Sequence, residues 1–284
     1  MAKLRRLALA GIPVVSWGYA NAADLPPAPS LPEQTAEEEF SGWYLRGDVG
    51  GGVNSAGPEL ETAPEAPAAS AAAAARRFDN ATLSPFGMVD VGAGYQFNSW
   101  FRTDATLEYR AGANLHSPAS LTFAGPAQYA DFYRADVASI VGLVNGYANL
   151  GTWYGLSPFL GVGVGLADTK VSGFTDQGPG YTNYGDFANG SKTSFAWALM
   201  AGVDFDLTPN FKLELGYRYL NYGTITTGGS NCLTAESGGT LSLADCRSGV
   251  ASTIASRNRL ASNDFRLGLI YLIGEAPAPP VVAR

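Results

Sequence analysis

Apolar and polar side chains alternate in segments along most of the chain. Between Phe211 and Tyr219 every second residue is apolar or aromatic, and the residues between them are Lys212, Glu214, Gly216 and Arg218. Successive side chains of a β-strand point to opposite faces, so this segment would have one apolar and one polar face. The pattern recurs and predicts eight strands, at residues 41–53, 84–97, 101–112, 132–149, 157–169, 193–207, 211–223 and 262–273.

The connections between these strands alternate in length. Three are short, at 98–100, 150–156 and 208–210, and four are long, at 54–83, 113–131, 170–192 and 224–261. Outer-membrane barrels join an even number of strands by short periplasmic turns and long extracellular loops. The sequence therefore predicts an all-β fold, an eight-stranded antiparallel up-and-down transmembrane β-barrel with its long loops outside the cell.

Alternation alone does not say which face meets lipid. A soluble lipocalin-like barrel or a sandwich would also have period-two strands, with the apolar faces inward. Three features favour a membrane barrel: the polar faces carry charges of both signs, they are rich in glycine, and aromatic residues gather at the predicted strand ends. We therefore expect a lumen charge network of Arg46, Asp48, Asp90, Arg102, Asp104, Glu108, Arg134, Asp136, Lys212, Glu214, Arg218 and Arg266.

The first residues are typical of a secretory signal. A basic start with Lys3 precedes a short apolar run at 7–15, and Ala20 and Ala22 mark a small-residue cleavage site. An uncleaved anchor is the alternative, but the run is shorter than the ~20 residues that a membrane-spanning helix needs. The predicted organisation is a signal peptide (1–22), a Pro/Glu-rich periplasmic linker (23–40), an outer-membrane barrel (41–273) and a Pro-rich tail (274–284).

Several of these features together resemble a known family. The Ala-Asp-Leu-Pro-Pro start at 23–27, the Gly-Trp-Tyr-Leu-Arg-Gly first strand at 42–47 and the glycine-rich strands resemble small outer-membrane barrels of alphaproteobacteria. These belong to the opacity-protein, porin-like superfamily and are similar to the OmpA transmembrane barrel. The resemblance covers 41–273 and implies a place in the bacterial outer membrane. It also implies a signal for the barrel-assembly machinery at Arg266, Gly268, Tyr271 and Ile273, although Ile273 replaces the usual terminal aromatic residue.

The candidate reactive residues are few. Cys232 and Cys246 share the last long loop, and in an exported protein such a pair indicates a disulfide. The single histidine, His116, lies in a different predicted loop, so no metal site is expected. The neighbouring Ser117 does not make a nucleophile–base pair with it, because such a pair needs a spatial orientation and a third group. We expect no enzymatic activity and no cofactor.

The predicted fold limits the function. Eight strands enclose an interior just wide enough for side chains, so paired charges would plug the lumen. We expect a structural or surface-exposed envelope protein that supports membrane integrity and interacts through its loops. The alternative is a narrow porin-like channel for ions or small solutes. The expected partners are outer-membrane lipid, lipopolysaccharide, the barrel-assembly machinery and host or environmental ligands at the loops. The net charge of −7 disfavours nucleic acid.

Overall fold

The computed structural model describes residues 41–63, 75–122, 128–177, 184–232 and 253–274. Within these ranges the regular structure consists of β-strands. No helix in this part of the chain is long and apolar enough to cross a membrane. The predicted signal peptide, the whole linker and nearly all of the tail lie outside the described residues. Cys246 does too, so the disulfide with Cys232 stays a prediction.

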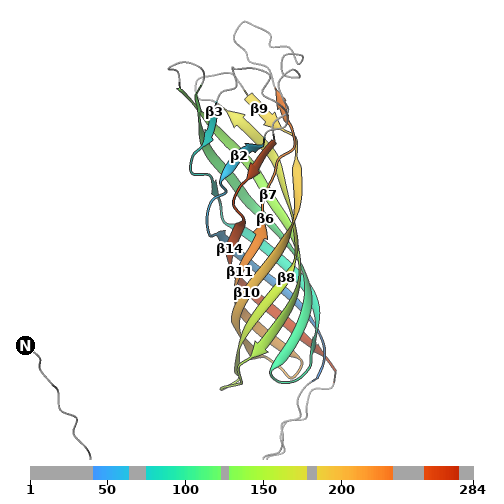
Figure 1. Cartoon of the computed structure of the whole chain (residues 1–284). Coiled ribbons are helices and arrows are strands. Elements are labelled where there is room, and N and C mark those ends of the chain that lie inside the picture. The colour runs from blue at the N-terminus through green and yellow to red at the C-terminus, as the bar shows by residue number, and fades with distance from the viewer. Residues whose placement is uncertain (1–40, 64–74, 123–127, 178–183, 233–252, 275–284) are drawn as a thin grey trace, which may run out of the picture. The chain divides into compact units, whose positions relative to one another are not determined.

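Eight antiparallel strands close into a barrel (Figure 1). Each strand pairs with the next along the chain, and the last pairs with the first through a register that joins Trp43 to Ile273. The prediction of an up-and-down eight-stranded barrel is confirmed. Its strands are β1 (Gly42–Asn54), β5 (Phe86–Gln96), β6 (Phe101–Thr122), β7 (Gln128–Asn149), β8 (Leu156–Gln177), β10 (Gly190–Asp206), β11 (Phe211–Gly223) and β14 (Leu260–Ile273).

Short turns join the strands at one end of the barrel, and six small strands lie in the long connections at the other. The small strands are β2 (Leu60–Ala63), β3 (Ala75–Phe78), β4 (Thr82–Leu83), β9 (Tyr184–Phe187), β12 (Ser230–Cys232) and β13 (Thr253–Ser256). β3 and β4 extend the edge of β6, β9 pairs with β8 and β12, and β2 pairs with β13 as a separate two-stranded sheet.

β6, β7 and β8 are longer than predicted, at 22 residues each. A transmembrane β-strand needs only about 9–11 residues, so these three continue well beyond the bilayer. Most of the predicted loop 113–131 is therefore strand. His116, which we expected in a loop, lies in β6 opposite Arg134 of β7.

The outer wall of the shorter, membrane-sized part of the barrel is apolar. Val91, Val144 and Phe265 are each more than 60 % exposed, which in water would be unfavourable and in lipid is favourable. Trp43 and Trp100 are exposed near the short turns, and Tyr109 is exposed one bilayer span further along β6. The prediction that the apolar faces meet hydrocarbon is confirmed for this part of the barrel except on β7, where Val141 and Leu143 of the predicted apolar face are buried inside.

The inside–outside pattern reverses along β7. Its outward residues are apolar up to Ile140, but beyond that point the outward Asp136 and Arg134 are exposed and polar. The inward residues Val137 and Tyr133 are buried there. Above the bilayer the outer side of the wall faces water instead of lipid, so the apolar side chains gather on the inner side, as in a soluble β-protein.

Two bulges accompany this reversal. The register of β6 against β7 shifts between Arg110 and Ala113, around Gly112 with φ +90°. The register of β8 shifts near Gly173, with φ +59°. Both glycines adopt the left-handed region that other residues rarely occupy, and the extra residue in a bulge changes which side chains point inward.

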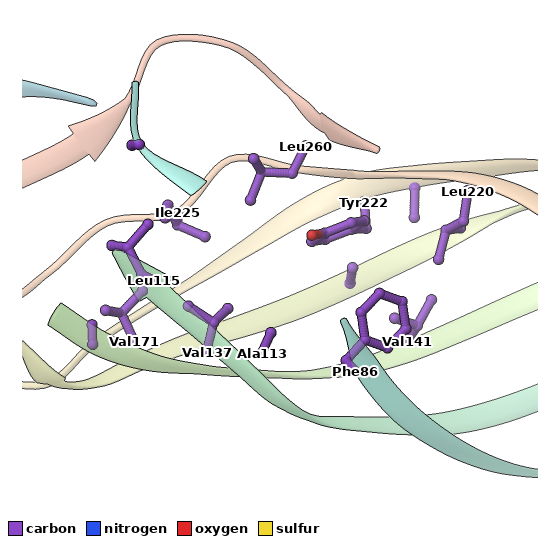
Figure 2. Close-up of a cluster of buried hydrophobic side chains, with 14 of the residues drawn as sticks. Phe86, Ala113, Leu115, Val137, Val141, Val171, Leu220, Tyr222, Ile225 and Leu260 are labelled. Atoms are coloured by element: carbon purple, nitrogen blue, oxygen red, sulfur yellow. The ribbon is translucent and has the colours of Figure 1, made fainter. Parts of the chain in front are cut away.

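The extracellular end of the barrel has a hydrophobic core (Figure 2). Leu115 of β6 and Val171 of β8 lie close to Ile225, which belongs to the connection after β11. Ile254 of β13 and Leu260 at the start of β14 are also buried in this cluster. The long connections therefore fold onto the barrel end and help to fill it.

Candidate functional site: the barrel lumen

Glycines on the inward faces make room for the large side chains of the lumen. A Cβ atom on Gly92 would lie 3.1 Å from Cγ of Arg46, and one on Gly94 would lie 2.6 Å from the Tyr44 hydroxyl oxygen. The lumen-facing glycines thus hold space that long charged and aromatic side chains occupy. This is the packing expected of the narrow interior of an eight-stranded barrel.

Arg46 of β1 is the centre of the lumen network. Its guanidinium donates to Asp48 at 2.9 Å, to Asp104 of β6 at 2.9 Å and to Glu214 of β11 at 2.8 Å. It also donates to the Tyr147 hydroxyl of β7 at 3.0 Å. Charged hydrogen bonds are stronger than neutral ones, so one side chain ties four strands together across the lumen.

Arg102 of β6 makes a second junction towards the short turns. It reaches Asp204 of β10 at 3.1 Å and Glu214 of β11 at 2.9 Å. Its guanidinium carbon lies 4.7 Å from the centre of the Tyr147 ring and 5.0 Å from that of Phe159. Ion pairs and ring contacts together surround this arginine, which is 2 % exposed.

Two further clusters lie in the same lumen. In the first, Arg110 and Arg218 both contact Glu108 and Asp264, at distances of 2.5–2.8 Å. In the second, Arg266 of β14 donates from one nitrogen to the carboxyls of Asp48 at 2.5 Å and Asp90 at 2.8 Å. Every one of these charges is on a side chain at most 5 % exposed.

The structure brings together nine of the twelve residues expected in the network, and three lie elsewhere. Arg134 and Asp136 point outward and are exposed, because they stand on the part of β7 where water lies outside the wall. Lys212 faces inward but sits at the periplasmic mouth, where it pairs with the half-exposed Asp206 at 3.2 Å. The nine that meet are Arg46, Asp48, Asp90, Arg102, Asp104, Glu108, Glu214, Arg218 and Arg266.

Sequence reasoning left out several members of the network. Arg110, Asp204 and Asp264 carry buried ion pairs, and Asn145 donates to Asp104 at 2.7 Å. Arg110, Asp204 and Asp264 stand on the polar parity of their strands, so the alternation could have identified them. Asn145 shares the parity of Val141 and Leu143, the apolar face of its strand in the sequence, so the alternation could not have identified it.

The described residues offer no reactive constellation. They contain no group of three or more His, Cys, Asp or Glu side chains that could hold a metal ion. His116 is exposed on the outer wall, whereas Ser117 is 2 % exposed and points inward. Adjacent strand residues point to opposite faces, so these two side chains are separated by the wall itself. The chemistry that the lumen can supply is charge pairing and hydrogen bonding.

A comparison with family models decides the wider class. The model described as "Outer membrane protein beta-barrel domain" matches residues 27–242, about three quarters of the chain. The chain belongs to this outer-membrane β-barrel family. Membership agrees with the apolar outer wall and places the protein in the bacterial outer membrane, in contact with its lipid.

Proteins similar to this outer-membrane protein occur in several bacteria. An uncharacterized protein of Brucella suis biovar 1 is 34% identical over 73% of this chain and 77% of its own length. A Rickettsia canadensis protein named "Putative adhesin" is 29% identical over 64% of this chain and 72% of its own. The crystal structure of OprG from Pseudomonas aeruginosa covers 84% of this chain and 98% of that one, with 13% identity and a TM-score of 0.45.

The last strand of this outer-membrane protein contains the residues expected to direct its assembly. Arg266 and Gly268 of β14 point into the lumen, and Tyr271 and Ile273 point outward. Tyr271 packs against Phe211 of β11, with ring centres 4.9 Å apart. The inward Arg266 and Gly268 and the outward Tyr271 and Ile273 are the four residues that the family resemblance indicated as a signal for the barrel-assembly machinery. Recognition by that machinery stays a prediction.

Proposed function

We propose that this protein is a closed barrel of the outer membrane that works as a surface-exposed envelope protein, and that it neither conducts solutes nor catalyses a reaction. One observation carries the proposal: the interior is occupied along its length. The ion-pair network fills the membrane part, and the apolar cluster with Ile225 and Ile254 fills the extracellular end. Both fillings oppose the passage of a hydrated solute.

The extracellular extension supports the surface role. β6, β7 and β8 continue past the bilayer and present Arg134, Asp136 and Lys170 on an exposed outer wall. The word adhesin in the name of the Rickettsia canadensis relative agrees with such a role. In this proposal the wall and the long connections meet lipopolysaccharide and host or environmental ligands, while the barrel anchors them.

The absence of catalysis rests on a separate argument. A nucleophile needs a base within hydrogen-bonding distance, and the wall separates the side chains of His116 and Ser117. If the refolded protein hydrolysed lipid, and His116→Ala abolished the activity, this part of the proposal would be wrong.

Planar-bilayer recording on refolded protein tests the closed barrel. We expect a membrane with inserted protein to show no stable single-channel steps. As a positive control for detection, a porin that is known to conduct is recorded in the same bilayers. Reproducible steps from the unmodified protein would favour the alternative function, a narrow channel for ions or small solutes.

Binding by intact cells tests the surface role. Cells of a non-adherent Gram-negative strain that express the protein should bind immobilised host-cell matrix or host cells more strongly than cells with an empty vector. The variant Arg134→Ala with Lys170→Ala changes the exposed wall but no lumen contact, and it serves to locate the binding. Equal binding by expressing and empty-vector cells would contradict adhesion as the surface role.

A further inference from the structure

The lumen contains more acidic than basic side chains. Among the described residues that are buried there, the guanidiniums are Arg46, Arg102, Arg110, Arg218 and Arg266, and the carboxyls are Asp48, Asp90, Asp104, Glu108, Asp204, Glu214 and Asp264. If all were ionised, two negative charges would have no positive counterpart in an interior that packed side chains and lipid shield from water. A buried charge without a counterion is strongly unfavourable, so positive charge must enter from elsewhere.

The ion pairs show where one of these two excess charges lies. Glu108 and Asp264 are matched by two arginines, Arg110 and Arg218. Asp90 has one cationic partner among the described residues, Arg266, and shares its Nη2 atom with Asp48. Asp48 is also reached by Arg46, but Arg46 is divided between two other carboxylates as well. The pair Asp48 and Asp90 therefore has too little positive charge.

The geometry of this pair indicates a shared proton. Asp48 and Asp90 stand directly opposite each other in the register of β1 and β5. One nitrogen of Arg266 contacts an oxygen of each carboxyl, so the two groups lie side by side in the lumen. Asp90 is 5 % exposed, and no donor among the described residues reaches its Oδ1 atom. Ionised carboxylates only accept hydrogen bonds, so contact between two of them is favourable when one carries a proton.

Other charged groups face the pair from every side. They are Arg46 on β1, Glu108 on β6 directly opposite Asp90, Glu214 on β11 through its contact with Arg46, and Arg266 on β14. Two of these four are carboxylates, so the surroundings do not supply the missing positive charge. Protonation of one member removes the repulsion between directly opposed like charges.

We propose that Asp48 and Asp90 bind one proton between them in the closed barrel, taken up from solvent, and that loss of this proton at alkaline pH loosens the lumen. In an unfolded chain both aspartates are ionised at neutral pH. The folded barrel therefore holds a proton that the unfolded chain does not, and its stability falls as the pH rises through the ionisation of the pair. The proposal is independent of the surface role.

Two asparagine substitutions of opposite expected effect test it. Asp90→Asn keeps the shape of a neutral carboxyl and needs no proton. The matched control, Asp264→Asn, neutralises a carboxylate that already balances arginines. The measurement is the midpoint temperature of the heat-induced shift in gel mobility of the full chain in detergent, from neutral to alkaline pH.

We expect the midpoint of the unmodified protein to fall with rising pH and that of Asp90→Asn to stay constant. Asp264→Asn should be lowered at every pH and keep the slope of the unmodified protein. If Asp90→Asn keeps that slope, or is lowered at every pH as Asp264→Asn is, the proposal is wrong.

Infrared spectra give a second readout: a protonated-carboxyl band in the folded protein that Asp90→Asn removes. Absence of this band, with a midpoint that rises with sodium concentration, would assign the compensation to a metal cation and overturn the proposal.

Discussion

Arg46 of β1 and Glu214 of β11 meet inside the barrel, with Nη2 of the arginine 2.8 Å from Oε1 of the glutamate, although β14 lies between their strands. The backbone ladders join each strand only to its neighbours. This contact, and those of Arg46 with Asp104 and Tyr147, tie strands that no ladder connects. The lumen therefore contributes a cross-link as well as a filling.

The first prediction concerns that cross-link. Arg46→Met would leave the carboxylates of Asp104 and Glu214 with fewer partners in the interior. Removing one partner of a buried ion pair costs about 3–5 kcal/mol, because the remaining charge stays buried. Urea unfolding in lipid vesicles should show a loss of this size. As a control, Arg257→Ala breaks an exposed pair with Glu61 and should cost about 0–1 kcal/mol. Equal losses for the two variants would show that burial of the pair is not what matters.

The second prediction concerns the space that glycine provides. An alanine at Gly94 would place its Cβ against the Tyr44 ring and the carbonyl oxygen of Thr103, whereas one at Gly142 would meet nothing within 4 Å. Overpacking costs about 1–3 kcal/mol. Gly94→Ala should lower the midpoint of the heat-induced gel shift and the refolding yield, and Gly142→Ala should change neither. A tolerated Gly94→Ala would mean that Tyr44 can leave the position it occupies in the lumen.

How far the sequence predicts this barrel depends on which solvent each strand meets. Period-two alternation gives the faces of a strand but not the medium outside it. In the membrane part, the apolar parity of β11 and β14 was assigned to lipid, and the structure agrees. On β7 the same rule placed Arg134 and Asp136 in the lumen, and this was wrong, because the strand leaves the bilayer near Ile140 and the wall beyond it is surrounded by water.

The extracellular extension is the part that the sequence does not predict. Gly112 and Gly173 introduce bulges that change the parity of β6 and β8, so alternation cannot be followed through them. The loss of pattern after residue 112 was interpreted as a loop. Long-range partners such as Ile225 and Ile254 complete the core there, and their burial depends on contacts that no local periodicity records.

The third prediction tests where the bilayer ends. Val144 of β7 is 62 % exposed on the membrane wall, and Asn114 of β6 is exposed on the same outer side beyond the bulge, opposite Asp136. Arginine near the bilayer midplane costs about 2–4 kcal/mol, and near or beyond the interface about 0–1 kcal/mol. Val144→Arg should therefore lower stability in vesicles, and Asn114→Arg should leave it nearly unchanged. A large loss for Asn114→Arg would place the bilayer boundary further along β6.

The fourth prediction concerns the hold of the long connections on the barrel end. Ile254 of β13 is 1 % exposed in the apolar cluster, and the exposed Arg257 follows it three residues later. Ile254→Asp would bury a carboxylate among apolar side chains, which costs several kcal/mol, so the segment should detach. A local opening whose free-energy cost falls by about 1.4 kcal/mol occurs tenfold more often. We therefore expect trypsin to cut the variant after Arg257 or Arg259 on intact cells at least about tenfold faster than it cuts the unmodified protein.

The neighbouring residue provides the control for this last experiment. Ala255 stands on the opposite face of the same strand and is half-buried, so Ala255→Asp should cause less cutting. Mass spectrometry of the released peptides identifies the cleaved bonds. The heat-induced gel shift of Ile254→Asp should keep most of its midpoint, because the ion pairs of the membrane part remain intact. If Ile254→Asp were as resistant to trypsin as the unmodified protein, the connection would be held by contacts other than the apolar cluster.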